Sequence, residues 1–97
     1  MKQDMVDLCL AYVRAVPPDD VRAVMRLSLL DWAACGIAGQ AEGGFSDWAG
    51  AVRAGGSCTS FDGVARDVTD AALVNGTLSH ALDYDDTHFA HIGHLSV

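Results

Sequence analysis

The chain has 97 residues, of which 51% are hydrophobic and 20% charged, and six Lys and Arg against thirteen Asp and Glu give a formal net charge of −7. A chain near this length buries roughly 60–65% of the surface that its unfolded form exposes, which suffices for one modest core but not for a second domain. An acidic chain without a basic stripe cannot neutralise phosphates, so neither nucleic acid nor a membrane surface is expected as a partner.

The cysteine pattern indicates a reduced setting. Cys9, Cys35 and Cys58 are odd in number, far apart and outside any C-x-x-C pair, which excludes a disulfide framework and a zinc knuckle. The most apolar stretch, residues 27–41, contains Asp31 and falls short of the roughly 18 uninterrupted residues that a membrane span needs. We therefore predict a cytoplasmic protein.

The first predicted helix covers residues 5–16, where apolar side chains recur at steps of three and four. Pro17-Pro18 ends it, because a proline ring does not fit a helix interior and pushes the preceding residue toward extended geometry. Asp19 or Asp20 is then the expected N-cap of the next helix.

The second predicted helix runs from about residue 20 to residue 38. Residues 33–39 are almost all small, so a neighbouring backbone could approach closely there. An ordinary buried helix face is the simpler interpretation, and we favour it. Residues 40–44 are predicted to form a loop.

The third predicted helix covers residues 45–54, with Ser46 or Asp47 as its cap and Gly55-Gly56 as its end. A short extended piece is expected around residues 59–61. These elements and the next helix give an all-α fold of about four helices with one short extended segment.

The last predicted helix, from Thr69 to about Tyr84, has several candidate N-caps in residues 67–70. Its middle, residues 71–82, carries no formal charge unless His80 is protonated, which indicates burial on more than one side. On a helical wheel one face collects a glycine and three polar residues, the last of them only if the helix continues: Gly76, His80, Asp83 and Thr87.

Carboxylates and imidazoles gather at the end of this helix. The string Asp83-Tyr84-Asp85-Asp86-Thr87 is followed by histidines at three-residue steps, namely His88, His91 and His94. Neighbouring carboxylates raise one another's pKa and imidazoles titrate near neutrality, so the segment has what acid/base chemistry requires.

Simpler interpretations compete with this one. We favour Asp85 and Asp86 as a helix cap or a solvated pair, and a histidine such as His80 is more often hydrogen-bonded in a core than catalytic. The H-x-x-H-x-x-H spacing matches no strong zinc signature, and Gly93 interrupts any regular helix there. We therefore predict no metal ligands, and an Asp/His metal-binding loop stays as an alternative.

The stretch from Asp70 to His88, continued by His94 and Ser96, closely resembles the signature of the MmgE/PrpD family. Upstream, residues 29–32 (LLDW) and 36–39 (GIAG) resemble the family's second helix. That family includes 2-methylcitrate dehydratase, cis-aconitate decarboxylase and iminodisuccinate epimerase. The resemblance covers most of this chain but only the beginning of a family member.

The resemblance implies an all-helical domain, with an α/β lid domain later in the chain, a homodimer, and cofactor-free chemistry on small di- and tricarboxylates. Residues 1–97 would be the N-terminal part of the helical domain. The catalytic residues carried over are Asp83 as a base or as the group that orients an imidazole, Thr87 as a hydrogen-bond donor to the substrate, and His94 in proton transfer or carboxylate binding. His94 precedes Leu95-Ser96 where many relatives have Pro-Ser.

The positions of the basic residues indicate that the site is incomplete. A polycarboxylate needs cationic clamps, yet after Arg66 there is no Lys or Arg and only four histidines. We therefore expect cations from another segment or subunit, including a lysine and a histidine beyond Val97, and sequence missing after it.

The leading hypothesis is the N-terminal portion of a cofactor-independent lyase or isomerase that abstracts a proton next to a carboxylate. The first alternative is a catalytically inert, truncated helical packing or dimerisation module. The second is the Asp/His metal-binding loop.

Overall fold

Four helices and one two-stranded sheet make up the part of the chain that the structure, a computed structural model, describes: residues 2–84, 87, 90 and 93–94. In chain order the elements are α1 (Lys2–Arg14), α2 (Asp19–Glu42), α3 (Ser46–Ala51), β1 (Cys58–Thr59), β2 (Ala65–Arg66) and α4 (Val68–His80). The predicted mainly helical fold is confirmed. No described helix combines the length and hydropathy that crossing a bilayer would require.

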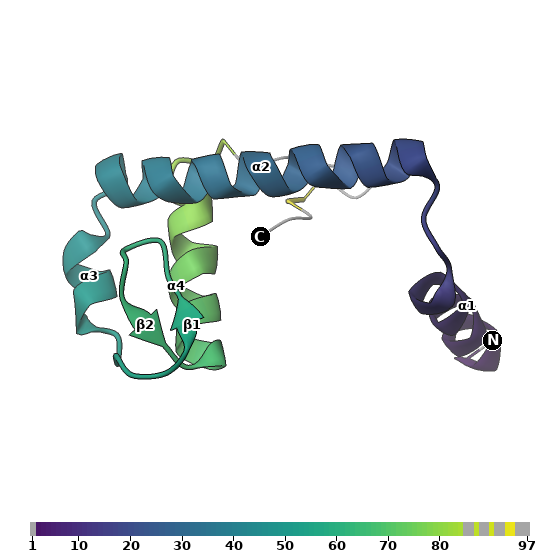
Figure 1. Ribbon diagram of the computed structural model, residues 1–97, viewed down its shortest axis with the longest axis horizontal. Coiled ribbons are helices and arrows are strands. Elements are labelled where there is room, and N and C mark those ends of the chain that lie inside the picture. Colours follow the sequence, from purple (N-terminus) through teal and green to yellow (C-terminus); the bar gives the residue numbers. More distant parts are fainter. Residues whose placement is uncertain (1, 85–86, 88–89, 91–92, 95–97) are drawn as a thin grey trace.

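The long helix α2 is the axis of the molecule (Figure 1). Helix α4, the β1–β2 hairpin and α3 gather at its C-terminal end, whereas α1 lies beyond its N-terminal end. The Cα radius of gyration is 16.1 Å, against about 13 Å for a compact chain of 100 residues. The excess comes from α1 and the uncovered half of α2, which extend the molecule to 45 Å along its longest axis.

Helix α2 differs from the prediction at both ends. Its N-cap is Pro18 without a side-chain hydrogen bond, so the prediction that Asp19 or Asp20 caps it is wrong. Both aspartates instead lie in the first turn, where carboxylates interact favourably with the helix dipole. The predicted loop at residues 40–44 is also wrong in part, because the helix continues through Glu42, and it ends near Gly44, whose φ is +75°.

The small residues of α2 permit a close approach of backbones. A Cβ added at Gly39 would collide with the carbonyl oxygen of Leu78 in α4, and one added at Gly36 would collide with the ring of Phe61. The Phe61 ring also contacts Trp32, with ring centroids 4.8 Å apart. The favoured interpretation of an ordinary buried face is therefore incomplete, since glycine is required where α2 crosses α4.

Helix α3 closes a small core. Ala49 of α3 and Val74 and Leu78 of α4 are fully buried, and Val52 and Phe61 pack against them. The residue before this helix, Phe45, is its N-cap and makes no side-chain cap hydrogen bond, so the prediction of a cap at residue 46 or 47 is wrong. The helix also ends three residues earlier than predicted.

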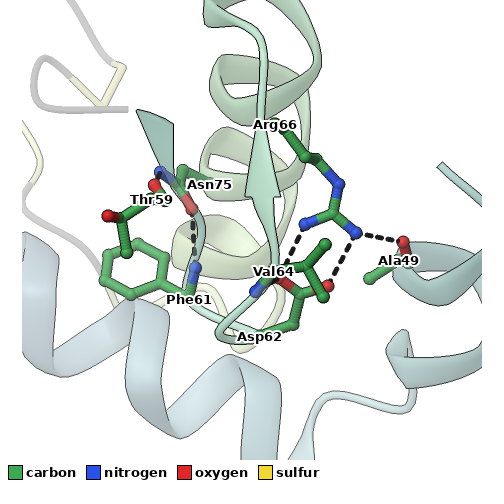
Figure 2. Close-up of polar contacts among 7 residues, drawn as sticks. All are labelled: Ala49, Thr59, Phe61, Asp62, Val64, Arg66 and Asn75. Atoms are coloured by element: carbon green, nitrogen blue, oxygen red, sulfur yellow. Dashed lines mark hydrogen bonds and ion pairs between the residues drawn. The ribbon is translucent and has the colours of Figure 1, made fainter. Parts of the chain in front are cut away.

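The short hairpin contains a buried ion pair (Figure 2). Cys58 pairs with Arg66 and Thr59 with Ala65 in antiparallel register, so the predicted extended segment is confirmed only at residue 59, and β2 was not predicted. The fully buried Arg66 donates from Nη1 and Nη2 to the two carboxylate oxygens of Asp62, at 2.7 and 2.8 Å. These hydrogen bonds hold the pKa of the Asp62 carboxyl below its usual range.

The guanidinium of Arg66 links the hairpin to α3, because Nη2 also donates to the carbonyl oxygen of Ala49 at 2.6 Å. On the other side, the Asn75 amide of α4 accepts from the backbone N–H of Phe61 at 2.9 Å and donates to the carbonyl of Thr59 at 3.0 Å. The hairpin is thus fixed to both neighbouring helices (Figure 2). The three cysteines form no disulfide, as predicted.

Candidate functional site

Helix α4 carries the residues that lead into the site. Its N-cap is Asp67, whose carboxylate accepts from the backbone N–H of Asp70 at 2.9 Å, as expected for this stretch. The helix ends at His80, so the predicted continuation to Tyr84 is wrong. The backbone N–H of Asp83 donates to the carbonyl of His80 at 3.0 Å, and Asp83 has φ = +55°. Aspartate is among the few residues that adopt this left-handed conformation readily, so the chain turns here.

The three predicted catalytic residues lie together beyond this turn. Nε2 of His94 is 3.0 Å from Oδ1 of Asp83, and Nδ1 of His94 is 3.4 Å from Oγ1 of Thr87. With its proton on Nε2, a neutral imidazole donates to the carboxylate and accepts the hydroxyl proton of Thr87 at Nδ1. The side chains are accessible, since Asp83 is 76% and His94 25% exposed.

His80 joins this group from the last turn of α4. Its Nδ1 is 3.9 Å from Oδ1 of Asp83, and its ring lies 4.7 Å from that of His94, centroid to centroid. Its side chain is 48% exposed, so the interpretation of His80 as a core histidine is wrong. The helical wheel predicts His80 near Asp83 and Thr87. His80 does lie near Asp83, but through the turn and not through a continuing helix, and Thr87 joins the group through His94.

The same side chains could hold a metal ion. One ligand atom each from His80, Asp83 and His94 lie within 4.8 Å of one another. The metal-binding loop that the sequence left as an alternative uses the histidines spaced three residues apart. Two of them, His88 and His91, lie outside the described residues.

A hollow of about 630 Å³ opens beside the group and is lined by Phe45, Gly76, Thr77, His80, Ala81 and Asp83. None of these lining residues is a lysine or arginine. The two arginines nearest in sequence are engaged elsewhere: Arg66 with Asp62, and Arg53 with the carboxylates of Asp67 and Asp70, at 3.0 Å from each. The described part of the hollow therefore offers no cationic clamp.

The family model for the MmgE/PrpD N-terminal domain matches residues 3–97. The chain belongs to the MmgE/PrpD family. The resemblance of the aspartate- and histidine-rich signature to that family is thereby confirmed, for the N-terminal domain. No curated protein and no solved structure matches the chain.

In this MmgE/PrpD domain, sequence reasoning missed two residues of the hollow. Phe45 comes from the junction of α2 and α3, and no local pattern indicates that this junction lies beside the end of α4. Thr77 was predictable from the sequence, because it lies on the polar side of α4, one position before the core residue Leu78. Its hydroxyl donates to the carbonyl of Leu73 at 2.8 Å. The predictions for Asp85, Asp86 and Ser96 concern positions outside the described residues.

Proposed function

We propose that this chain is the N-terminal part of a cofactor-independent lyase or isomerase that abstracts a proton next to a carboxylate of a small di- or tricarboxylate. The observation that carries the proposal is the hydrogen-bonded series Asp83, His94 and Thr87, with 3.0 Å between carboxylate and imidazole. A carboxylate that holds an accessible imidazole in one tautomer is a recurrent arrangement for general base catalysis.

In this mechanism Asp83 orients the imidazole through Nε2 and stabilises the imidazolium that forms. His94 accepts the substrate proton at Nδ1, and the electron pair of the broken C–H bond becomes the new C=C bond. The C–O bond to the β-hydroxyl breaks in the same step, and the hydroxyl leaves as water with a proton from a general acid outside the described residues. Thr87, displaced from Nδ1, donates a hydrogen bond from its hydroxyl to a substrate carboxylate. General acid/base groups placed in this way contribute about 10²–10⁴-fold to a rate.

The substrate's charge requires groups outside the described hollow. With Asp83 in the lining and no basic residue there, a di- or tricarboxylate would be repelled unless Lys or Arg side chains arrive from another segment or a second subunit. A homodimer is therefore part of the proposal, and the exposed apolar side chains of α2 support it. The cytoplasmic location is also part of the proposal, and the odd number and wide spacing of the cysteines in the sequence support it.

The test is the turnover of the Asp83→Asn variant of the complete enzyme, which includes the cationic groups that this chain lacks, with 2-methylcitrate and with cis-aconitate, followed by formation of the product. Asparagine tolerates the left-handed backbone conformation of Asp83, so the turn is kept while the charge is lost. We expect a loss of about 100-fold in kcat.

The matched control is Asp47→Asn, which removes the same charge from an exposed position in α3 and should change kcat less than twofold. Unchanged turnover in Asp83→Asn would remove Asp83 from the mechanism. A complete protein that is inactive on both substrates would favour the second candidate function, a helical packing or dimerisation module, for which the uncovered apolar surface of α2 is the supporting observation.

A further inference from the structure

We propose that His80, Asp83 and His94 form a binding site for a borderline divalent transition-metal ion, with Zn²⁺ as the probe. Oδ1 of Asp83 lies 3.0 Å from Nε2 of His94 and 3.9 Å from Nδ1 of His80. In a tetrahedral zinc site with bonds of 2.0–2.1 Å, neighbouring ligand atoms are about 3.3 Å apart. These two distances bracket that separation, and the three ligand atoms together lie within 4.8 Å of one another. Side-chain movements of about 1–1.5 Å would therefore bring them to the spacing of a tetrahedral site.

The donor set selects the class of metal. Two imidazoles and one carboxylate suit Zn²⁺ and its neighbours in the first transition series, whereas Mg²⁺ and Ca²⁺ prefer shells made of oxygen. Three protein ligands leave a fourth position open. His80 and Asp83 both line the 630 Å³ hollow, so the proposed site borders a space open to water or a small ligand.

Helix α4 prepares the site electrostatically and geometrically. His80 is the last residue of the helix, whose C-terminal end carries a partial negative charge that favours a cation. The hydrogen bond from the Asp83 N–H to the His80 carbonyl fixes the turn between these two ligands. The preceding residues Leu78 and Ser79 are buried, which anchors the end of the helix in the core.

Thr87 supplies the outer support that metal-binding histidines usually have. When Nε2 of His94 binds the ion, its ring proton lies on Nδ1, and the Thr87 hydroxyl oxygen 3.4 Å away accepts it. Without metal, the proton on Nε2 is donated to Asp83. Metal binding therefore moves the ring proton of His94 from Nε2 to Nδ1. The hydrogen bond from Nε2 to the Asp83 carboxylate is then replaced by the bond from Nε2 to the ion.

One consequence of this site rests on the proposed function. A metal bound to Nε2 of His94 and Oδ1 of Asp83 occupies the two groups that would orient and carry the proton. Zinc would then inhibit turnover, and a chelator would restore it. The binding itself does not depend on catalysis.

The experiment is a calorimetric titration of the full chain with ZnCl₂, repeated with Co²⁺ to observe the absorption of a tetrahedral site. We expect one ion per chain, affinity at least tenfold weaker in His80→Gln and in Asp83→Asn, and affinity weaker by about 10–100-fold in Thr87→Val, which removes only the outer support. MgCl₂ should give no saturable binding. Circular dichroism checks that each variant is folded.

The matched control is the double variant His88→Gln/His91→Gln, whose affinity for zinc should change less than twofold. Absence of saturable zinc binding, unchanged affinity in both His80→Gln and Asp83→Asn, or loss of binding in the double variant would each overturn the site. An active enzyme that binds no zinc contradicts only this inference, whereas a zinc-binding protein without lyase activity contradicts only the proposed function.

Discussion

The two halves of α2 have similar apolar composition but different surroundings. In the C-terminal half, Cys35, Gly36 and Gly39 are buried beneath α4 and the hairpin (Figure 1). In the N-terminal half the large apolar side chains are exposed: Val21, Val24, Met25, Leu27, Leu29 and Leu30. Apart from Trp32, which contacts Phe61, small residues mark where α2 packs within the described part of this chain.

The uncovered half is apolar on more than one side. Leu27 is 65% exposed and Leu29, on another face, 63%, and a hollow of about 850 Å³ follows the helix between Pro17 and Trp32. Large apolar side chains exposed together in this way normally mark a surface that another molecule or segment covers. The packed half thus carries the candidate site, and the other half offers the surface on which the proposed association of subunits depends.

The largest expected effect comes from comparing a substitution in the packed region, at Leu78 of α4, with one in the uncovered half of α2, at Leu27. Leu78→Ala should lower the free energy of unfolding by about 2–5 kcal/mol, because it leaves a cavity at a fully buried position. Leu27→Ala should change it by less than about 0.5 kcal/mol in a monomeric chain, because that side chain is already in water. Urea denaturation followed by circular dichroism measures both.

Measuring the free energy of unfolding of both variants at several protein concentrations tests whether a second copy covers the exposed half of α2. A cost for Leu27→Ala that grows with concentration would show that a second copy covers this half of α2 in solution. Similar costs for both variants at every concentration would contradict the division into a covered and an uncovered half.

The second effect tests the close approach of α2 and α4. Gly39→Ala should destabilise the chain by about 1–3 kcal/mol, because the added methyl group meets the backbone carbonyl of Leu78, which cannot rotate away. Gly50→Ala, in α3, is the control: nothing lies within 4 Å of its added Cβ, and the change should stabilise the helix by about 0.5–1 kcal/mol. Thermal melting distinguishes the two signs, and a stable Gly39→Ala variant would contradict the observed packing.

Some features set by local chemistry were predictable from the sequence, although the side-chain caps predicted for α2 and α3 were wrong. Helix α1 ends before Pro17-Pro18 as expected, but at Arg14 and not at residue 16. The cap at Asp67 and the core position of Leu78 likewise follow from side-chain chemistry and helical period. The mainly helical fold could be predicted for the same reason.

Features set by contacts between distant residues were not predictable. Strand β2 pairs with β1, and its Arg66 binds Asp62 and reaches Ala49; nothing in a two-residue segment indicates these contacts. Within the site, the resemblance supplied Asp83, Thr87 and His94, but the contact of His80 with His94 spans fourteen positions and depends on the turn at Asp83. If α4 had continued as a helix past His80, Asp83 would lie further along that helix and not at the turn.

The smallest effect compares the N-termini of α4 and α2. Asp67→Ala should cost about 1 kcal/mol, because it removes the hydrogen bond to the Asp70 N–H. Asp19→Ala should cost only a few tenths of a kcal/mol, because α2 has no side-chain cap and the Asp19–Arg22 ion pair, at 3.8 Å, is exposed. Asp67→Asn separates cap from charge, since asparagine caps as well as aspartate but cannot pair ionically with Arg53. If Asp67→Asn is as unstable as Asp67→Ala in urea denaturation, the ion pair with Arg53, and not the cap, stabilises the start of α4.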